Sequence, residues 1–543
     1  MTAVSAPAPA PSSAARTGGS RRLAGTGILL RLALRRDRLM APLWVAAIAG
    51  LVVSGAESIE KFYGTAGERA GLVQSTGANG SLRALYGPLF DDSLGAVVAW
   101  RLGGFAAVLA AVMSLLVVVR HTREEEETGR QELLSSAMVG RRAPLIAALL
   151  AALVANTALA LLVTGGLAGP AGSVAGALAV GLAVGATGML FAATAAIAAQ
   201  LTESARLARG MTAGVLGAAF VLRAAGDASS AGGSSVLTWL SPLGWAQNVR
   251  PYAGERWWAL LLVVVAAVVQ GAAAYTLAGR RDVGMSFLPA RPGPATGSLS
   301  TAGGLALRLQ RGSLLGWTAG FGLAGLVLGG MAEGAADLVG DNEQARQIFE
   351  RMGGQTGMSQ AFLSSMTGIF GMAAALYAVS GVLRLHGEET SQRAEPVLAN
   401  AVGRQRWAAG HLVVVFGGAV VVMLTAGLGL AAGHGKDFGP VLGASLAQLP
   451  AVWLLGGLAV LLYGVFPKAV AAAWAVAGLS LALGWIGPAL ELPRPVMNLS
   501  PFGHLPKLPG TAMEWTPVVV LTLGAVALVG AGLAGLRRRD LLT

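Results

Sequence analysis

The stretch EEETGRQELLSSAMVGRR, residues 125–142, is the most charged part of a chain of 543 residues in which 54% are hydrophobic and 12% are charged. Long apolar runs flank it on both sides. A closely similar stretch, EETSQRAEPVLANAVGRQR, occurs at 388–406, again between apolar runs. A charged element that recurs in the second half of an apolar chain predicts a molecule built from two similar halves.

The apolar runs have the length of membrane spans, because about 20 apolar residues cross the hydrocarbon core of a bilayer as a helix. The apolar content and the 78 glycines lie outside the range of ordinary soluble domains. Backbone groups in lipid must be hydrogen-bonded within their own segment, so we expect an all-α membrane protein. About 12 transmembrane helices are predicted, at 40–56, 95–119, 143–166, 173–199, 209–225, 257–278, 314–332, 365–383, 408–432, 441–465, 469–488 and 516–536.

Lysine and arginine are distributed unevenly between the loops. Of 39 such residues, 27 fall on one side of the predicted spans, in the segments 1–40, 120–142, 201–209, 279–313, 384–407, 466–469 and 537–543. By the positive-inside rule this side is cytoplasmic, so we expect a multi-pass protein of the cell membrane with both termini in the cytoplasm. The net charge of +12 follows from the same asymmetry, and we expect contact with the lipid bilayer and not with nucleic acid.

Three further pairs of segments support the repeat. They are LSPLG at 240–244 with LSPFG at 499–503, GRRD at 279–282 with RRRD at 537–540, and LALRRDRLMAPLW at 32–44 with LRLQRGSLLGW at 307–317. Six spans per half is an even number, so the two halves form a parallel repeat. The predicted domains are an N-terminal cytoplasmic segment with an interfacial helix at 1–39, a first transmembrane domain at 40–282, a cytoplasmic linker rich in Pro, Gly and Ser at 283–307, and a second transmembrane domain at 308–543.

The first charged stretch carries helix signals of its own. Thr128 followed by Gln131 fits a capping box, and Gly140 fits a C-terminal cap, so we expect a short helix at 129–139. A helix of this length is marginal in water and needs either the membrane surface or a protein partner to hold it. Four consecutive glutamates disfavour the negative inner leaflet, so a basic protein partner is favoured over lipid and over a merely solvated loop.

The same residues resemble a known family. The glutamate run, the Thr-Gly pair and the Glu-Leu-Leu between spans two and three resemble the coupling element of type-2 ATP-binding-cassette (ABC) exporter permeases. The tandem fused form is similar to actinobacterial exporters of polyketide antibiotics and other drugs. The resemblance implies that two copies of a separate nucleotide-binding subunit dock on these elements. The implied contact residues are Glu126, Glu127, Thr128, Gly129, Arg130 and Glu132 in the first element, and Glu388, Glu389, Thr390, Arg393 and Glu395 in the second.

The second element departs from the family pattern. The pair Ser391-Gln392 replaces the single glycine, which requires one inserted residue, and Pro396 stands where Leu133 stands in the first element. Proline is tolerated only in the first turn of a helix, so the second helix must start near residue 395 or be broken. We therefore expect the two couplings to be unequal.

The chain itself has no recognisable chemistry for energy coupling. A P-loop needs Gly-x4-Gly-Lys-Ser/Thr, which is absent, and the five histidines lack metal-ligand spacing. GLGLAAG at 427–433 nearly matches a dinucleotide fingerprint, but it lies inside a predicted span, where packing through small residues is the expected role. No catalytic residue, metal site or cofactor is predicted in this chain, and the resemblance places ATP and Mg on the partner subunit.

Two arginines fall within or at the edge of spans, and such charges are candidates for function. Arg101 lies near the outer boundary of span two, where Asp91 or Asp92 could neutralise it, so we expect an ion pair between Arg101 and Asp92, with substrate contact as the alternative. Arg223 stands at the end of span five.

The segments before the last span of each half hold Pro, Gly and aromatic residues between apolar flanks. Irregular backbone at that depth must be buried or line a cavity. In the family that the chain resembles, such segments dip into the outer face of the membrane, which implies an exit gate with the candidate residues Ser241, Pro242, Trp245, Ser500, Pro501 and Phe502.

The leading hypothesis is a permease, not an enzyme, that provides both membrane domains of an ATP-driven exporter. Its substrates would be small hydrophobic or amphipathic compounds, because the spans offer few ionisable contacts. The alternative is an ion-coupled secondary transporter of twelve helices. Such carriers usually place acidic residues or histidine inside the membrane, and none lies near the middle of a predicted span.

Overall fold

The computed structural model describes residues 23–135, 139–169, 172–230, 235–282, 284–288, 299, 301–332, 358–400, 402–486 and 493–540. Within these ranges every regular element is a helix, which confirms the predicted fold class. The chain divides into two compact units, residues 1–292 and 293–543. The division falls inside the expected linker 283–307, although the last part of that linker, from Ala302, already belongs to a long helix.

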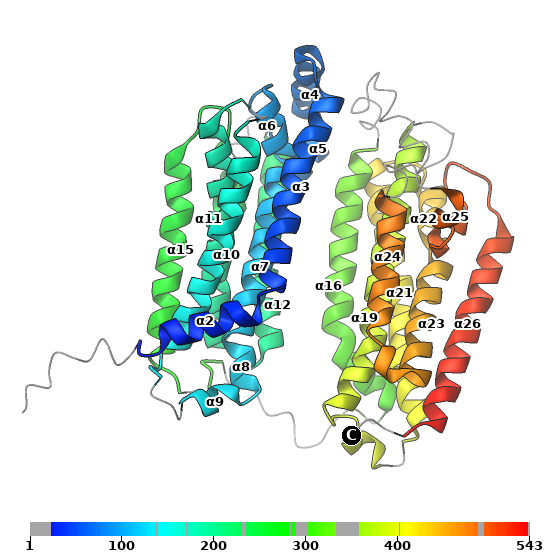
Figure 1. Ribbon diagram of the computed structural model, residues 1–543. Helices are drawn as coiled ribbons and strands as arrows, with labels where there is room; N and C mark the ends of the chain where they lie inside the picture. The colour runs from blue at the N-terminus through cyan, green and yellow to red at the C-terminus, as the bar shows by residue number, and fades with distance from the viewer. Residues whose placement is uncertain are drawn as a thin grey trace, which may run out of the picture. The chain divides into compact units, whose positions relative to one another are not determined.

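All six spans expected in the first unit are helices (Figure 1). The second span is interrupted by a short π-helix, η2, between α6 and α7. The helices are α3 (Met40–Phe62), α6 (Leu94–Val98) with η2 (Ala99–Gly103) and α7 (Gly104–Arg120), α10 (Ala143–Leu167), α11 (Val174–Leu201), α12 (Ala205–Ser229) and α15 (Trp257–Ala278).

The described residues of the second unit hold five helices of span length and one shorter apolar helix. The five are α16 (Ala302–Gly330), α19 (Met358–Thr390), α21 (Arg404–His434), α22 (Phe438–Leu446) continued by α23 (Leu449–Val465), and α26 (Trp515–Arg538). The shorter one is α24 (Ala472–Ile486), with 15 residues, at the place of the expected span 469–488. The described residues thus hold 11 helices long and apolar enough to cross a membrane, and α24 stands at the twelfth position.

Small residues bring the helices of the second unit into close contact, as predicted for GLGLAAG. A Cβ atom added to Gly429 of α21 would lie 2.4 Å from the carbonyl oxygen of Gly322 on α16. A Cβ on Gly464 of α23 would lie 1.9 Å from the carbonyl oxygen of Gly532 on α26. Backbones therefore touch directly, which is how membrane helices pack in the absence of a hydrophobic force between them.

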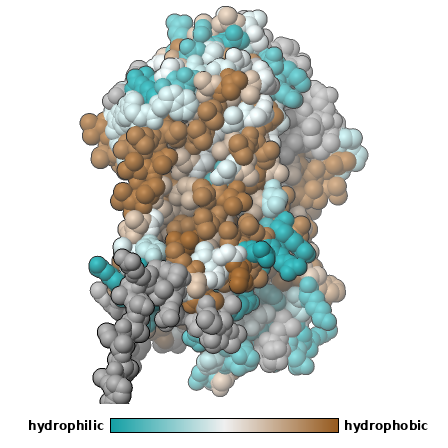
Figure 2. Space-filling view, turned by 60° about the vertical axis from the view of Figure 1, so that its left-hand side comes forward, coloured by the Kyte–Doolittle hydropathy of each residue, from teal (hydrophilic) through white to brown (hydrophobic). Residues whose placement is uncertain are grey.

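Large apolar side chains cover the outside of the span helices. On α15 the exposed ones include Leu261, Val264, Val265, Val268 and Val269. Figure 2 shows one face of the molecule, on which hydrophobic residues form a broad band between hydrophilic ends. An exposed apolar band of this kind is stable only against lipid, so it agrees with a multi-pass membrane protein.

Short helices lie at both ends of the first unit. α2 (Thr26–Arg36) packs through Leu29 against Ala143 and Ala147 of α10. It lies at the same end as α8 (Arg123–Glu127) and α9 (Arg130–Ser135), whereas α4 (Ala66–Ala78) and α6 lie at the opposite end (Figure 1). We call the first of these the α8–α9 end.

Candidate functional site

The first charged element forms two short helices joined by a tight turn. The hydroxyl of Thr128 donates to the carbonyl oxygen of Glu124 at 2.9 Å and closes the end of α8. Gly129 has φ 71°, a left-handed conformation that glycine adopts without strain, and it turns the chain into α9. The expected capping box of Thr128 with Gln131 is therefore wrong, because Thr128 ends one helix instead of starting the next. Residues 136–138 of the expected helix 129–139 lie outside the described residues.

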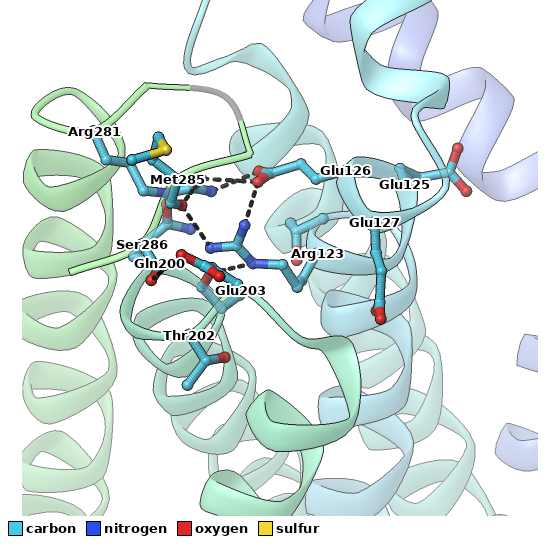
Figure 3. Close-up of polar contacts among 12 residues, drawn as sticks. Arg123, Glu125, Glu126, Glu127, Gln200, Thr202, Glu203, Arg281, Met285 and Ser286 are labelled. Carbon is cyan, nitrogen blue, oxygen red and sulfur yellow. Dashed lines mark hydrogen bonds and ion pairs between the residues drawn. The ribbon is translucent and has the colours of Figure 1, made fainter. Parts of the chain in front are cut away.

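The centre of the first element is a buried carboxylate shared by two arginines (Figure 3). Glu126 Oε2 lies 2.6 Å from Arg123 Nη1, and Glu126 Oε1 lies 2.5 Å from Arg281 Nη2. The side chains of Arg123, Glu126 and Arg281 are 1%, 5% and 8% exposed. Glu126 is thus turned into its own chain, although it was predicted to contact a partner.

The two arginines are also bonded to the ends of neighbouring spans. Arg123 Nε donates to the carbonyl oxygen of Ala199 at 3.0 Å, and Arg281 Nε donates to Gln200 Oε1 at 2.6 Å. Arg123 Nη2 donates to the carbonyl oxygen of Met285 at 3.1 Å. A buried ion pair is tolerated only when its remaining hydrogen-bonding groups are satisfied, and these bonds do so. The cluster therefore joins α8 to the end of α11 and to the segment after α15.

The other glutamates of the run also bond within this chain. Glu124 pairs with Arg209, Glu125 pairs with Arg36 at 2.6 Å, and Glu127 Oε2 accepts the backbone N–H of Ala205 at 3.0 Å. Ala205 is the first residue of α12, where a carboxylate is favoured by the helix dipole. The four consecutive glutamates were predicted to need a basic protein partner, and the structure shows that much of this need is met by α2, α11, α12 and the segment after α15.

Asp37, at the junction of α2 and α3, forms a second buried pair beside α8. Its Oδ2 lies 2.6 Å from His121 Nε2, and its Oδ1 lies 2.8 Å from Arg120 Nη1. Burial by itself raises the pKa of the Asp37 carboxyl, but the hydrogen bond to His121 and the charges of His121, Arg120 and Arg36 outweigh it and lower the pKa. The stability that Asp37 contributes is therefore present at neutral pH and is lost as the pH falls through its lowered pKa.

The second element repeats the buried carboxylate with a different residue. Glu389 Oε1 and Oε2 each lie 2.7 Å from the guanidinium of Arg539, and the hydroxyl of Tyr463 donates to Oε2 at 2.6 Å. The Glu389 side chain is 2% exposed. Its neighbour Glu388 pairs with Arg384 at 3.3 Å and with Arg393 at 3.2 Å.

The two elements share one register, which corrects the sequence alignment. Glu126 and Glu389 hold the same position, and three residues later Gly129 (φ 71°) and Gln392 (φ 58°) hold the same left-handed turn. No inserted residue is needed between these points, because Glu389, and not Glu388, corresponds to Glu126. Gln392 adopts without a glycine the conformation that Gly129 provides.

The arginine partners were missed in the sequence, although a signal for them was present. Arg281 is the last arginine of GRRD at 279–282, and Arg539 is the last arginine of RRRD at 537–540. These motifs were recognised as a repeated pair, and the glutamate stretches as another. The structure shows that in each half the two motifs bind each other.

Several predicted contact residues remain on the surface of the two elements. In the first, Thr128, Arg130 and Glu132 are exposed, with the Arg130 side chain 58% exposed. In the second, Thr390, Arg393 and Glu395 are exposed. The second helix, α20 (Glu395–Leu398), begins at the residue predicted from Pro396 and has four residues.

Comparison with known proteins places this chain in a family. Residues 299–537 match the family model described as the multidrug efflux system permease Rv1217c, C-terminal domain. The chain is 44% identical over 526 residues to the multidrug efflux system permease protein Rv1217c of Mycobacterium tuberculosis (strain ATCC 25618 / H37Rv), which covers 95% of each chain. The chain belongs to the Rv1217c family of multidrug efflux permeases. This membership confirms the resemblance to exporter permeases seen in the sequence.

In this member of the Rv1217c family, the Leu-Ser-Pro segments are tied to the span that precedes them. The hydroxyl of Ser241 donates to the carbonyl oxygen of Ala219 on α12 at 2.6 Å, and that of Ser500 donates to the carbonyl oxygen of Ser480 on α24 at 3.4 Å. Pro242 and Pro501 begin α14 (Pro242–Gln247) and η4 (Pro501–His504). Trp245 donates its indole N–H to Trp239, and Phe502 is half-buried.

The expected ion pair of Arg101 with Asp92 is wrong. The Arg101 guanidinium lies 4.7 Å from the centroid of the Tyr86 ring, and none of the ion pairs among the described residues joins it to Asp92. The carbonyl oxygen of Asp92 accepts a bond from Arg69 at 2.7 Å instead. An aromatic face attracts a guanidinium through its quadrupole, and this contact replaces the carboxylate.

Among the described residues, Arg223 has a carboxylate partner in an ion pair, whereas Arg101 has none. Its Nη1 lies 3.2 Å from Asp227 Oδ2, and its Nη2 donates to the carbonyl oxygens of Ala84 and Leu85 at 2.8 and 3.1 Å. Within the ranges that the structure describes, no group of three His, Cys, Asp or Glu residues could hold a metal ion.

Proposed function

We propose that this chain is the permease of an ATP-driven exporter of hydrophobic and amphipathic drugs, and that it supplies both membrane domains to two copies of a separate ATPase subunit. The observation that carries the proposal is the buried glutamate–arginine pair that fixes each charged element to the end of the last span of its half. The multidrug efflux role of the Rv1217c relative supports the same direction of transport.

The glutamate–arginine ion pairs hold each charged element rigidly against the ends of the spans. α8 is bonded to α2, α11, α12 and the segment after α15, so a force applied to α9 displaces the ends of several spans together. A buried ion pair resists separation, because removing one partner leaves a charge without water or a counter-ion. ATP and Mg would bind on the partner subunit, and this chain would convert the partner's movement into movement of its spans.

The exposed residues of the elements would form the docking surface. Thr128, Arg130 and Glu132 in the first element and Thr390, Arg393 and Glu395 in the second offer hydrogen bonds and charges of both signs. The irregular segments with Ser241 and Ser500 would form the exit gate, because each is hydrogen-bonded to the preceding span and so follows its movement.

The proposal places the α8–α9 end and both termini in the cytoplasm. The chain has no cysteine, so single cysteines can be introduced and labelled from either side. We expect cysteines at Ser135 and Ser391 to react with a membrane-impermeant maleimide only from the cytoplasmic side, and cysteines at Ser75 and Ser359 only from outside. Reversed labelling of either pair would refute this orientation.

The energy source is tested with the full chain in proteoliposomes. With the ATPase subunit that copurifies from native membranes, we expect ATP to drive movement of a neutral amphipathic dye such as Nile red, whereas the chain alone should hydrolyse no ATP. Dye movement driven by an imposed pH gradient, without ATP or an ATPase, would instead support the ion-coupled secondary transporter.

One structural feature supports the alternative of an ion-coupled secondary transporter. Asp227 is a fully buried carboxylate inside α12, the kind of group that proton-coupled carriers use. Its oxygens are occupied by Arg223 at 3.2 Å and by the hydroxyl of Thr238 at 2.8 Å. This engagement is typical of a structural pair, so we favour ATP as the energy source.

A further inference from the structure

A cavity of about 90 Å³ lies within the first unit, among η2, α7, α11, α12 and α14. Aromatic and small apolar residues form most of its wall, and Arg223 and Gln247 are its polar members. The aromatic residues are Tyr86, Phe90, Trp100, Phe105 and Phe220. A volume of this size suits one ring of an organic molecule, since apolar cavities only somewhat larger bind benzene.

An arginine guanidinium lies over each of three of these rings. The guanidinium carbons of Arg101, Arg250 and Arg223 lie 4.7, 4.1 and 4.8 Å from the ring centroids of Tyr86, Phe90 and Phe220, respectively. Only Arg223 of these three has a carboxylate in an ion pair among the described contacts, which is Asp227. Arg101 and Arg250 therefore place positive charge at two of the wall rings, which disfavours a cation in the cavity and favours an anion or the negative end of a dipole.

Gln247 brings a buried amide to this wall, next to the Asp227 carboxylate. Its Oε1 accepts from Arg223 Nη1 at 3.2 Å, which fixes the orientation of the amide. The Nε2 atom is buried and has no partner at hydrogen-bonding distance. A buried donor without an acceptor costs free energy, and a ligand that supplies the acceptor removes this cost.

The backbone around the cavity has two unusual features. The π-helix η2 (Ala99–Gly103) contributes Ala99, Trp100 and Gly103 to the wall, and π-turns inside membrane helices often mark functional sites. On another side, Pro251 lines the cavity between Arg250 (φ 52°) and Tyr252 (φ 61°), two residues in a left-handed conformation. Backbone strain of this kind persists where the surrounding structure holds it in place, as at sites that clamp a ligand.

We propose that this cavity binds the aromatic end of a neutral or anionic amphipathic molecule, with the ring among the aromatic walls and an acceptor oxygen on Gln247 Nε2. The site belongs to the first unit alone. It does not depend on how transport is energised, because binding can be measured on the chain without an ATPase.

The test compares three probes on the purified full chain by equilibrium dialysis. We expect benzoate and phenol to bind at least tenfold more tightly than benzylammonium, which has the same ring with a positive charge. Gln247→Leu should weaken benzoate binding about tenfold, which corresponds to roughly 1.4 kcal/mol. Equal or tighter binding of the ammonium compound would overturn the proposal.

A substitution that fills the cavity tests whether the probe binds there. Ala183 is buried on the cavity wall, so Ala183→Leu should abolish benzoate binding, whereas Ala175→Leu on the exposed face of the same helix should leave it unchanged. Unchanged binding in a folded Ala183→Leu variant would place the probe elsewhere and refute the site. A phospholipid retained by the parent chain and lost in this variant, detected by native mass spectrometry, would make the cavity a lipid site and would also refute it.

Discussion

Replacing Glu126 with alanine is expected to destabilise the first half of the chain by about 3 to 5 kcal/mol. The substitution leaves Arg123 and Arg281, whose side chains are 1% and 8% exposed, facing each other without a counter-ion. The loss is measured as a lower unfolding midpoint of the purified protein. We expect a similar loss for Glu389→Ala, because Arg539 and Tyr463 depend on that carboxylate in the same way.

The matched control is Glu124→Ala, two residues earlier on α8. Glu124 pairs with Arg209, but its side chain is 41% exposed, and an ion pair so open to solvent contributes about 1 kcal/mol or less. If Glu126→Ala and Glu124→Ala lower the midpoint equally, Glu126 is not the structural anchor described above.

Reversing the charges on the exposed face of the first element is expected to uncouple the permease without unfolding it. The double variant Arg130→Glu with Glu132→Lys alters two residues that face solvent. A charge-assisted hydrogen bond at an interface contributes about 1.5 to 3 kcal/mol, so the loss of even one should reduce substrate-stimulated ATPase activity at least tenfold. Membrane insertion and the unfolding midpoint should stay close to those of the parent chain.

The same reversal in the second element, Arg393→Glu with Glu395→Lys, is the matched comparison. We expect a smaller loss of stimulated activity, because α20 has four residues and starts with Pro396 in its first turn. Full activity in the first double variant, or a larger loss in the second, would contradict the expectation that the first element contributes more to coupling than the second.

The fold was largely predictable from the sequence, because membrane spans depend on local hydrophobicity. Runs of apolar residues indicated the helices, and Pro396 indicated where the second short helix begins. At the place of the expected span 469–488 the structure describes an apolar helix from Ala472 to Ile486, and Ile486 is the last described residue before 493.

The contact partners of the charged side chains could not be predicted in the same way. Glu126 and Arg281 are 155 residues apart, so their contact depends on how the spans pack and not on local pattern. The same is true of Arg101, for which Asp92 is near in sequence, whereas the Tyr86 ring is its neighbour in space. For Arg101 sequence proximity suggested Asp92, and for Glu126 the family resemblance implied a separate subunit. Tertiary packing supplied a different partner in both cases.

The pairing of Glu126 with Arg281 has a consequence for biosynthesis. The glutamate leaves the ribosome 155 residues before its arginine partner, a delay of about 8 to 30 seconds at ordinary rates of synthesis. The second half imposes a delay of similar length between Glu389 and Arg539, which are 150 residues apart. A nascent chain therefore cannot form the buried pair of either half until the last helix of that half has been made, so we expect a chain truncated before that helix to leave Glu126 or Glu389 without its arginine.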